Sequence, residues 1–395
     1  MSTPGEVLVV GASAAGVATA EALRRKGYLG RLTLLGAESH LPYDRPPLSK
    51  QVLSGGWEPE RVQLRQPEAL STLDAELILG DPAVSLDTAT RTVHTAAGRA
   101  LTAEAIVVAT GLRPRTFPGQ DRLAGVHALR TLDDALQLRT SLLGSSRLVV
   151  VGDGVLGAEI AATARNMGVS VTMTGPQPAP LAMQFGSLVS GLLADVHTSQ
   201  GVELRLGAAV TGLEGEHGRV TGVCLGSGEV LPADVVVVAF GAAPTTEWLA
   251  GSGLTIDNGL VCDSRCRAAE GIYAAGDVAR WHHERLNTML RLENRTNATE
   301  QGVAVADTII GSDKPYTPVP YFWTDQFDVK IHVHGVLFPD ADVSIVEGDP
   351  AGRRFVALYR RGGEVTGVLG RNMPKQARQH RQRELVANSV LTGGM

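Results

Sequence analysis

Residues 7–16 read VLVVGASAAG, an apolar run that passes directly into a glycine-rich turn. An alanine-rich segment follows to about Lys26, Gly27 ends it, and a second apolar run covers residues 32–35. Short apolar runs are typical of buried strands, and a glycine after a helical segment commonly ends the helix. The pattern therefore predicts a strand, a tight turn, a helix and a second strand.

The same order of elements recurs in the middle of the chain. Residues 148–157 read LVVVGDGVLG, a helical segment runs to about Met167, Gly168 ends it, and the next strand is expected at residues 170–174. Glycines in such a turn permit a tight bend and let backbone amides approach a pyrophosphate at the start of the helix. One such turn is a weak signal, but two in the same context predict two dinucleotide-binding domains.

The remaining apolar runs predict how the chain is divided. Those at residues 105–109 and 235–239 each precede a glycine and would complete the first and second dinucleotide-binding units. The run at 271–277 ends in a glycine and an acid and belongs to the first unit. We expect an α/β protein with two Rossmann-like domains and a small α+β C-terminal domain. The predicted bounds are 1–112 with 241–316 for the first domain, 113–240 for the second and 317–395 for the third.

Composition excludes several classes of function. The 395 residues carry a net charge of −5, so no basic surface for nucleic acid is expected. The longest apolar runs fall far short of the roughly 20 residues of a membrane helix, and the N-terminus lacks a signal-peptide pattern, which together favour a cytoplasmic protein. The histidines and cysteines have no metal-ligand spacing. Cys262 and Cys266 stand four apart, so a redox dithiol is an alternative.

An acid about 20 residues after the glycines normally binds the hydroxyls of the adenosine ribose. Glu38 has this position in the first unit. In the second unit the strand ends in MTGPQ at residues 173–177, with neither an acid nor an arginine for a 2′-phosphate. The choice between NADH and NADPH is therefore left open, and a weakened or vestigial second site is an alternative.

Residues 41–50 read LPYDRPPLSK, and their prolines predict a stiff, extended loop. Arg45 is a candidate partner for a pyrophosphate. Lys50 is a candidate to compensate negative charge on a reduced flavin. A solvated proline-rich turn is the alternative interpretation of the same residues.

Several longer strings carry a family resemblance over essentially the whole chain. With these strings the chain resembles the FAD-dependent ferredoxin reductases of bacterial oxygenase systems, the group of putidaredoxin reductase and the biphenyl dioxygenase reductases. The strings, beside the two glycine turns, are RPPLSK at 45–50, ATGLRP at 109–114, GD at 276–277, RLE at 291–293 and YFWTDQ at 321–326. The first and last are specific to the group, whereas the glycine turns occur in many flavoproteins. The resemblance implies a glutathione-reductase-like fold with FAD in the first domain and NADH, or NADPH, in the second.

The resemblance also implies roles for individual residues. The FAD pyrophosphate would be held by Gly11, Ser13, Ala15 and Gly16, the ribose by Ala37 and Glu38, the ribityl chain by Asp277, and the flavin by Arg45 and Lys50. The nicotinamide nucleotide would lie on Gly152, Gly154 and Gly157, with Glu159 and Trp323 near the flavin. Lys50, Glu159 and Trp323 are the candidate catalytic residues. Further cofactor contacts are expected from Pro46, Ala83, Ala109, Thr110, Gly111, Arg130, Val155, Leu156, Gly241, Gly276, Glu293, Asn294 and Arg295.

Two positions depart from the family pattern. Gly175 stands where the family usually has an acid, and Arg295 stands where many members have a tryptophan beside the flavin. The first departure leaves the preference for NADH in doubt, and the second alters the expected contact with the acceptor. The lack of a Cys-x-x-Cys pair agrees with the family and speaks against the disulfide reductases that share its fold.

The expected reaction is hydride transfer from NAD(P)H to FAD, followed by release of single electrons to an acidic iron-sulfur ferredoxin. That ferredoxin would serve a cytochrome P450 or a ring-hydroxylating oxygenase. The basic candidates for docking it are Arg291, Arg295, Arg371, Lys375, Arg378 and Arg381, although the C-terminal charges are equally explained as a solvated helix face. A monomer and a homodimer are both compatible with the sequence. The alternative functions are a ferredoxin-independent flavin oxidase or small-molecule reductase, and a redox-sensing flavoprotein resembling apoptosis-inducing factor.

Overall fold

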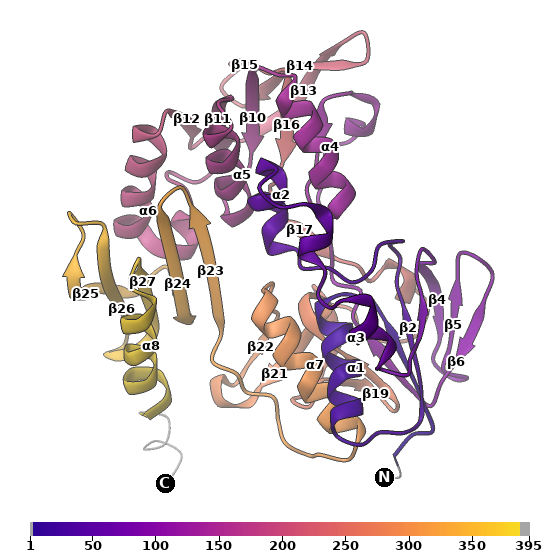
Figure 1. Cartoon of the computed structure of the whole chain (residues 1–395). Helices are drawn as coiled ribbons and strands as arrows, with labels where there is room; N and C mark the ends of the chain where they lie inside the picture. The colour runs from indigo at the N-terminus through magenta and orange to yellow at the C-terminus, as the bar shows by residue number, and fades with distance from the viewer. Residues whose placement is uncertain (1–2, 388–395) are drawn as a thin grey trace. The chain divides into compact units, whose positions relative to one another are not determined.

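The computed structural model describes residues 3–387, which form two compact units (Figure 1). Residues 1–2 of the predicted first domain and 388–395 of the predicted third domain lie outside the described residues. Each unit is assembled from separate stretches of the chain. These are Met1–Asp44, Glu60–Arg113 and Ala243–Pro318 for unit 1, and Arg45–Pro59, Pro114–Ala242 and Val319–Met395 for unit 2.

Unit 1 is built on a six-stranded sheet in the order β19-β20-β7-β1-β2-β3. All neighbours in it are parallel except β19 and β20, and β20 pairs with β7, so the strand before Gly276 belongs to the sheet that begins at Glu6. The bounds are β1 (Glu6–Val10), β2 (Arg31–Leu35), β3 (Glu76–Ile78), β7 (Ala105–Val108), β19 (Arg267–Ala269) and β20 (Ile272–Ala274).

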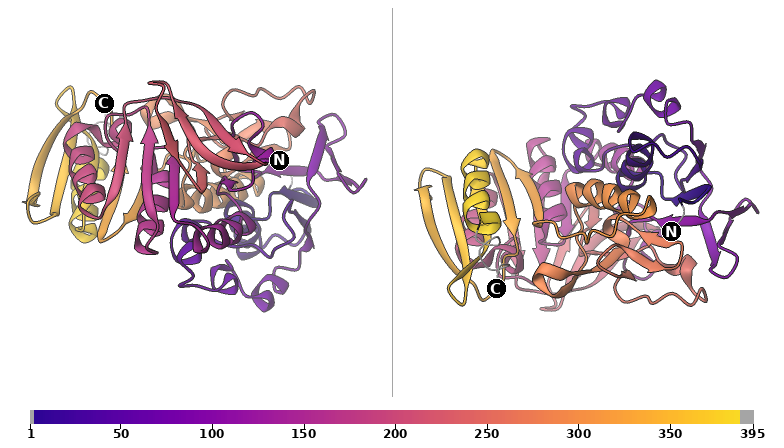
Figure 2. Two further views of the ribbon diagram at one scale, coloured as in Figure 1. Left: turned by 90° about the horizontal axis from the view of Figure 1, so that it is seen from above. Right: turned by 90° about the horizontal axis from the view of Figure 1, so that it is seen from below.

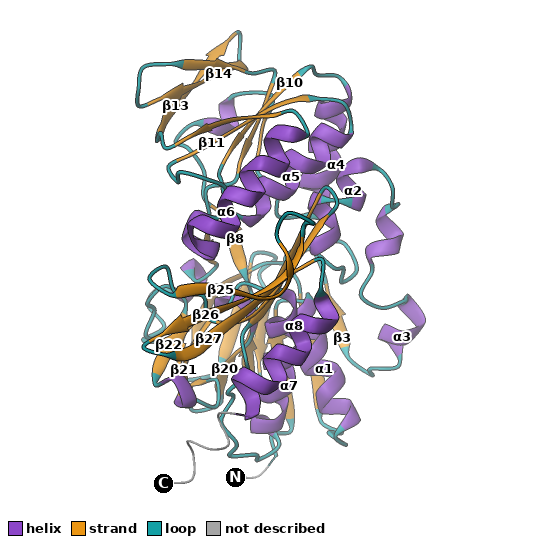
Figure 3. Ribbon diagram, turned by 90° about the vertical axis from the view of Figure 1, so that its left-hand side faces the viewer, coloured by secondary structure: helices purple, strands orange, loops and turns teal. Residues whose placement is uncertain are grey.

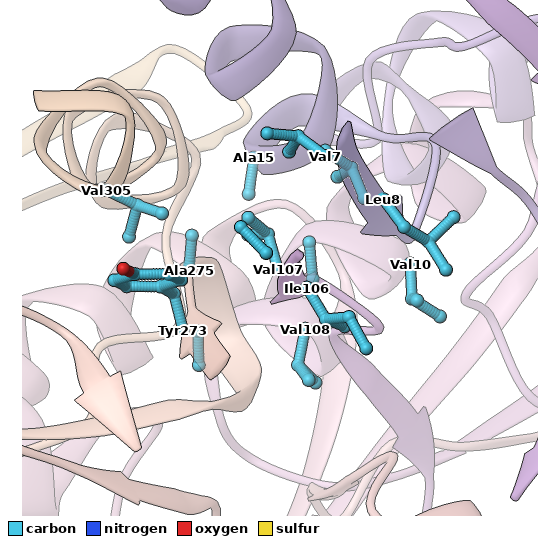
Figure 4. Close-up of a cluster of buried hydrophobic side chains, with 14 of the residues drawn as sticks. Val7, Leu8, Val10, Ala15, Ile106, Val107, Val108, Tyr273, Ala275 and Val305 are labelled. Carbon is cyan, nitrogen blue, oxygen red and sulfur yellow. The ribbon is translucent and has the colours of Figure 1, made fainter. Parts of the chain in front are cut away.

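The core of unit 1 lies between this sheet and two helices that pack side by side, α1 (Ala14–Arg25) and α7 (Arg295–Ile309). Figure 4 shows side chains of β1, β7 and β20 gathered with Ala15 of α1 and Val305 of α7. A Cβ on Gly302 would lie 2.6 Å from the carbonyl oxygen of Ala15, so the two helices approach closely because this position is glycine. Burying each valine or leucine here contributes about 1.5–3 kcal/mol.

Smaller sheets and short helices complete unit 1. The antiparallel sheet β4-β5-β6 projects at one edge (Figure 1), and a second three-stranded sheet has the order β18-β21-β22. The bounds are β4 (Ala83–Asp87), β5 (Thr92–Thr95), β6 (Ala100–Thr102), β18 (Leu260–Cys262), β21 (Ala279–His283), β22 (Thr288–Leu290), α3 (Pro67–Ser71), η4 (Glu247–Leu249), η5 (Gly276–Val278) and η6 (Glu284–Leu286). The chain passes between the units at five points, three of which lie near η2 (Pro59–Val62), β8 (Leu112–Pro114) and β17 (Ala242–Pro244).

Unit 2 contains a five-stranded parallel sheet in the order β12-β11-β10-β16-β9. A three-stranded antiparallel sheet, β13-β14-β15, accompanies it. The strands are β9 (Val126–His127), β10 (Arg147–Val151), β11 (Ser170–Gly175), β12 (Val202–Leu206), β13 (Val210–Glu216), β14 (Arg219–Leu225), β15 (Val230–Pro232) and β16 (Val235–Val238). The helices are α2 (Gln51–Ser54), η3 (Gln120–Arg122), α4 (Leu132–Leu143), α5 (Val155–Asn166) and α6 (Ala182–Ser199).

The C-terminal part of unit 2 is a five-stranded antiparallel sheet, β23-β24-β27-β26-β25, with helix α8 beside it (Figures 2 and 3). The bounds are β23 (Tyr321–Gln326), β24 (Val329–Gly335), β25 (Asp342–Asp349), β26 (Arg354–Arg361), β27 (Glu364–Arg371), α8 (Pro374–Arg381) and η7 (Gln382–Ala387). Two Rossmann-like sheets and this α+β part confirm the predicted α/β fold class. None of the helices in residues 3–387 is long and apolar enough to cross a bilayer.

Two details differ from the sequence-based expectations. The segment expected to be an extended proline-rich loop contains a 3₁₀ helix, η1 (Pro46–Ser49), because the fixed φ of proline also suits a helical turn and the Leu48 amide donates to the Arg45 carbonyl at 2.9 Å. Arg371 was expected on a docking surface, but it is only 1% exposed at the end of β27. Its side chain therefore cannot contact a docked protein.

His334 is buried in the C-terminal sheet. The Tyr321 ring stacks on it with centroids 4.8 Å apart, and neither ring nitrogen of His334 has a hydrogen-bond partner among the described residues. Burial lowers the pKa of His334 to about 4, and the positive charges of Arg381 and Arg378 and the neighbouring His332 add to the effect. The unfolded chain therefore binds the proton more readily than the folded one.

We expect the unit to lose stability as the pH falls from about 6.5 to about 4, because protons then bind mainly to the unfolded state. The variant His334→Phe replaces the imidazole by a ring that does not titrate. Its free energy of unfolding should fall by about 2 kcal/mol less than that of the parent between pH 7 and pH 5. Thermal unfolding at both pH values measures it. The control is His94→Phe, which changes an exposed histidine of β5; equal pH dependence in both variants would contradict the role of His334.

Candidate cofactor-binding sites

The first glycine turn brings α1 almost into contact with β1 and β7. Gly11 has φ +122°, and its amide donates to the Leu35 carbonyl at 2.7 Å. A Cβ on Gly11 would lie 2.1 Å from the Ala109 carbonyl oxygen, and a Cβ on Gly16 would lie 1.9 Å from the Gly11 carbonyl oxygen. Neither position accepts a side chain, so the helix starts directly at the edge of the sheet.

The second turn repeats this geometry in unit 2. Gly152 has φ +140°, and its Cβ would lie 2.2 Å from the Ala239 carbonyl oxygen. A Cβ on Gly157 would lie 2.0 Å from the Gly152 carbonyl oxygen. At Gly154, by contrast, a Cβ would meet nothing within 4 Å, so open space lies in front of α5.

The helices after these turns begin without side-chain caps. Ser13 and Gly154 are the N-cap residues of α1 and α5, and neither supplies a capping hydrogen bond. By contrast, Thr131 and Asn294 cap α4 and α7 with their side chains. Uncapped amides and the positive end of the helix dipole suit a pyrophosphate. Both turns, including Val155 and Leu156 in the first turn of α5, therefore fit a dinucleotide.

At the same edge of unit 1, Glu38 follows β2 and accepts a hydrogen bond from the Tyr43 hydroxyl. Ala37 beside it is exposed. This is the position expected for contact with the adenosine ribose of a dinucleotide held on α1.

Gly276 and Asp277 follow β20 and lie close to α1. A Cβ on Gly276 would be 3.0 Å from the Cβ of Ala15, and the Gly276 amide donates to Oε1 of Gln301 at 2.9 Å. Gln301 is fully buried in α7. Gln301 was not predicted as a site residue, because a glutamine within a helix has no distinguishing sequence pattern.

Three further residues of unit 1 that were predicted to contact the cofactor lie in or beside its loops. Thr110 donates through its hydroxyl to the Thr245 carbonyl at 2.8 Å, and Gly111 has φ +67°. Ala83 is half-buried at the start of β4. The Thr110–Thr245 hydrogen bond joins two loops at the edge of the sheet where ligands bind in such folds.

Polar residues at the start of helix α7 pair with one another and with Asp44. Asn294 accepts a hydrogen bond from the Asn297 amide, and Glu293 pairs with Arg291 at 2.7 Å. Nε of Arg295 lies 2.5 Å from the Asp44 carboxylate. A cation in the first turn of a helix is unfavourable, and the Asp44 carboxylate offsets it.

In unit 2, Lys50 and Glu159 form a buried ion pair. Nζ of Lys50 lies 2.6 Å from Oε2 of Glu159, and their side chains are 14% and 7% exposed. The hydroxyls of Ser49 and Thr324 donate to the same carboxylate at 2.6 and 2.9 Å. A buried carboxylate that accepts hydrogen bonds from several side chains is held in one orientation.

This network joins three elements of unit 2. Thr163, one turn after Glu159 in α5, donates to the Ser49 carbonyl at 2.8 Å, and Thr324 lies on β23. Trp323, its neighbour on β23, stacks on Tyr321 with centroids 5.9 Å apart. Ser49, Thr163 and Thr324 were not predicted as site residues, because only the fold brings them to Glu159.

Arg45 and Arg130 lie together in unit 2, where the Arg45 guanidinium donates to the Arg130 carbonyl at 2.6 Å. Pro46 follows as the first residue of η1. Gly241, after β16, has φ +114° and accepts a hydrogen bond from the Arg115 amide at 3.0 Å.

The cysteines are poorly suited to dithiol chemistry. Cys262 and Cys266 are buried, and burial raises the pKa of Cys266 to about 12. Its sulfur accepts a hydrogen bond from Gln301 at 3.3 Å. Thiol exchange requires a thiolate, so this alternative finds no support in the structure.

Comparison with known proteins explains the paired turns. The family model described as pyridine nucleotide-disulphide oxidoreductase matches residues 5–302, and the model described as reductase C-terminal matches residues 321–390. The chain belongs to this oxidoreductase family. It is an enzyme that uses FAD and NAD(P)H, and the glycine turns and uncapped helices described above fit both dinucleotides.

Its relatives include reductases of oxygenase systems. The chain is 38% identical over 332 residues to the ferredoxin–NAD(+) reductase subunit of the benzene 1,2-dioxygenase system of Pseudomonas putida, covering 83% of this chain and 80% of that one. The ferredoxin reductase for the CYP199A2 system of Rhodopseudomonas palustris has a TM-score of 0.92 at 35% identity, covering 96% and 93%. The covalent putidaredoxin reductase–putidaredoxin complex has a TM-score of 0.91 at 32% identity, and the match covers 96% of this chain and 92% of that one.

We expect Gly157→Ala to weaken nucleotide binding at the second turn of this oxidoreductase. The new methyl group overlaps the Gly152 carbonyl, so α5 must move away from the turn. The expected cost is about 1–3 kcal/mol of stability and a loss of about tenfold in affinity for the nicotinamide nucleotide. Titration calorimetry with the FAD-loaded protein measures the affinity.

Gly191→Ala is the matched control, because Gly191 also lies inside a helix of unit 2 and its Cβ would meet nothing within 4 Å. It should be neutral or slightly stabilising. Equal nucleotide affinity in both variants would show that α5 does not hold the nucleotide through this turn.

Proposed function

We propose that this oxidoreductase is an FAD-dependent ferredoxin reductase that takes a hydride from NADH and passes single electrons to an iron-sulfur ferredoxin serving a cytochrome P450 or a ring-hydroxylating oxygenase. The observation that carries the proposal is the pair of matched glycine turns, each before an uncapped helix. The relatives include reductases of a dioxygenase system and of the CYP199A2 system, which supports the choice of acceptor.

Bound FAD supplies the chemistry, because it accepts two electrons as hydride and gives them up one at a time. The protein would hold its pyrophosphate on the first turn of α1 and its ribose near Glu38. Gly152, Gly154 and Gly157 would hold the nicotinamide nucleotide. The Lys50–Glu159 ion pair would place a fixed positive charge near the flavin. Trp323 of β23 would lie near the flavin on the side where the electron acceptor docks.

The proposed division of labour follows the predicted domains. Residues 1–112 and 241–316 would bind FAD, 113–240 would bind NAD(P)H, and 317–395 would contribute to the acceptor side. A cytoplasmic location is part of the proposal, because all three cysteines are unpaired, as expected in a reducing compartment.

A basic surface for an acidic ferredoxin is proposed on α8. Lys375 and Arg378 are exposed on this helix, and Arg381 is half-buried at its end. Exposed cations of this kind steer an acidic partner and raise its association rate. In unit 1, Arg291 and Arg295 are engaged with Glu293 and Asp44, so they are weaker candidates.

The first experiment mixes the FAD-loaded protein with NADH and with NADPH without oxygen and follows the visible absorbance of the oxidised flavin. We expect NADH to bleach it at least about tenfold faster, since the second turn has no arginine for a 2′-phosphate. Negligible bleaching by both would contradict the proposed reductase function. Cytochrome c reduction that needs no added ferredoxin would instead favour a direct flavin oxidase or small-molecule reductase.

Charge reversal on α8 tests the docking surface. Lys375→Glu with Arg378→Glu should raise the KM for an acidic ferredoxin about tenfold at low salt and weaken its dependence on ionic strength. Steady-state kinetics over a range of salt concentrations measures both. Lys314→Glu with Arg122→Glu changes the net charge equally at exposed positions elsewhere. If both double variants behave alike, α8 is not the docking surface.

A further inference from the structure

The second glycine turn contains a carboxylate that the proposed function has not used. Asp153 stands between Gly152 and Gly154 and is only 5% exposed. A Cβ on Gly175 would lie 2.3 Å from Oδ2 of Asp153 and 2.5 Å from its Cγ. The carboxylate of Asp153 therefore fills the space that any side chain at position 175 would need.

The loop after β11 holds this carboxylate in a fixed orientation. The Gln177 amide nitrogen donates to Oδ2 at 2.8 Å, and Nε2 of Gln177 donates to Oδ1 at 2.6 Å. Oε1 of Gln177 accepts a hydrogen bond from the Met183 amide, which sets the direction of the side-chain amide. Each carboxylate oxygen accepts about two hydrogen bonds, so both keep capacity for a ligand hydroxyl.

The strand register gives the counterpart of this arrangement in unit 1. Val10 pairs with Leu35, and Val151 pairs with Thr174 at the same point of the two turns. Counting onward from these pairs, Asp153 corresponds to Ala12, Gly175 to Gly36 and Gln177 to Glu38. Unit 1 thus has its acid in the loop after the second strand, whereas unit 2 has a glutamine there and an acid in the turn.

We infer that Asp153 binds the 2′-hydroxyl of the adenosine ribose and makes the second site selective for NADH over NADPH. The acid that is missing at Gly175 is supplied from the neighbouring turn, at the same edge of the sheet. A hydroxyl donates to this carboxylate, whereas a 2′-phosphate is repelled by it. The inference rests on the proposed use of NADH and names the residue responsible.

The test measures binding without turnover, by titrating the FAD-loaded protein with NAD⁺ and NADP⁺ in a calorimeter. Asp153→Asn keeps the shape and removes the charge. The variant should bind NAD⁺ about tenfold more weakly and NADP⁺ more tightly than the parent. The ratio of the two dissociation constants should therefore change at least about thirtyfold. The exchange Asp153→Gly with Gly175→Glu returns the acid to the strand end and should restore the preference for NAD⁺.

Gln177→Leu is the structural control, because it loosens the loop and leaves the charge in place. It should weaken both nucleotides and leave their ratio within about threefold of the parent value. If Asp153→Asn also weakens both equally, the residue only supports the loop and the inference is wrong.

Titration of the unmodified protein distinguishes failure of the reductase function from failure of the role proposed for Asp153. Failure to bind either nucleotide would contradict the proposed reductase function itself. A parent that binds NADP⁺ more tightly would overturn the role of Asp153 and leave the reductase function standing.

Discussion

The close approach of each nucleotide-binding helix to its glycine turn is the constraint on which the rest of the structure depends. The helices at Gly16 and Gly157 begin so near the preceding turn that a single methyl group would overlap a carbonyl oxygen. This approach aims the uncapped amides of each helix at the carboxyl edge of its sheet. In unit 1, Glu38 and the loops after the neighbouring strands lie at this same edge, where a dinucleotide would place its phosphates.

The parts of the fold that depend on local sequence were predictable. Apolar runs before glycine turns identified β1, α1 and β2, and their repeat identified β10, α5 and β11. The segment at Pro46 was not, because the φ angle of proline suits both an extended chain and a 3₁₀ turn; burial of Leu48 favours the turn. The burial of Arg371 could not be predicted either, because the residues next to it in sequence are the same for a covered strand end as for an exposed one.

The candidate sites divide in the same way. The glycines are recognised from their spacing, whereas the partners of Glu159 lie far from it in sequence and meet it only through the fold. The resemblance to a family pointed to Lys50 and Glu159 but not to Ser49 or Thr324. Asp153 was passed over because the meaning of an acid in the turn depends on the missing side chain at Gly175 opposite.

The interleaving of the two units has a consequence for synthesis. The chain leaves unit 1 after Asp44, Arg113 and Pro318 and returns to it at Glu60 and Ala243, so it changes unit five times. Unit 1 cannot be complete on the ribosome until residue 318 has emerged, and unit 2 must wait longer still for its C-terminal sheet. The segment 45–59, which carries Lys50, is translated roughly a hundred residues before its partner Glu159. Neither unit is therefore encoded by one continuous stretch of the chain.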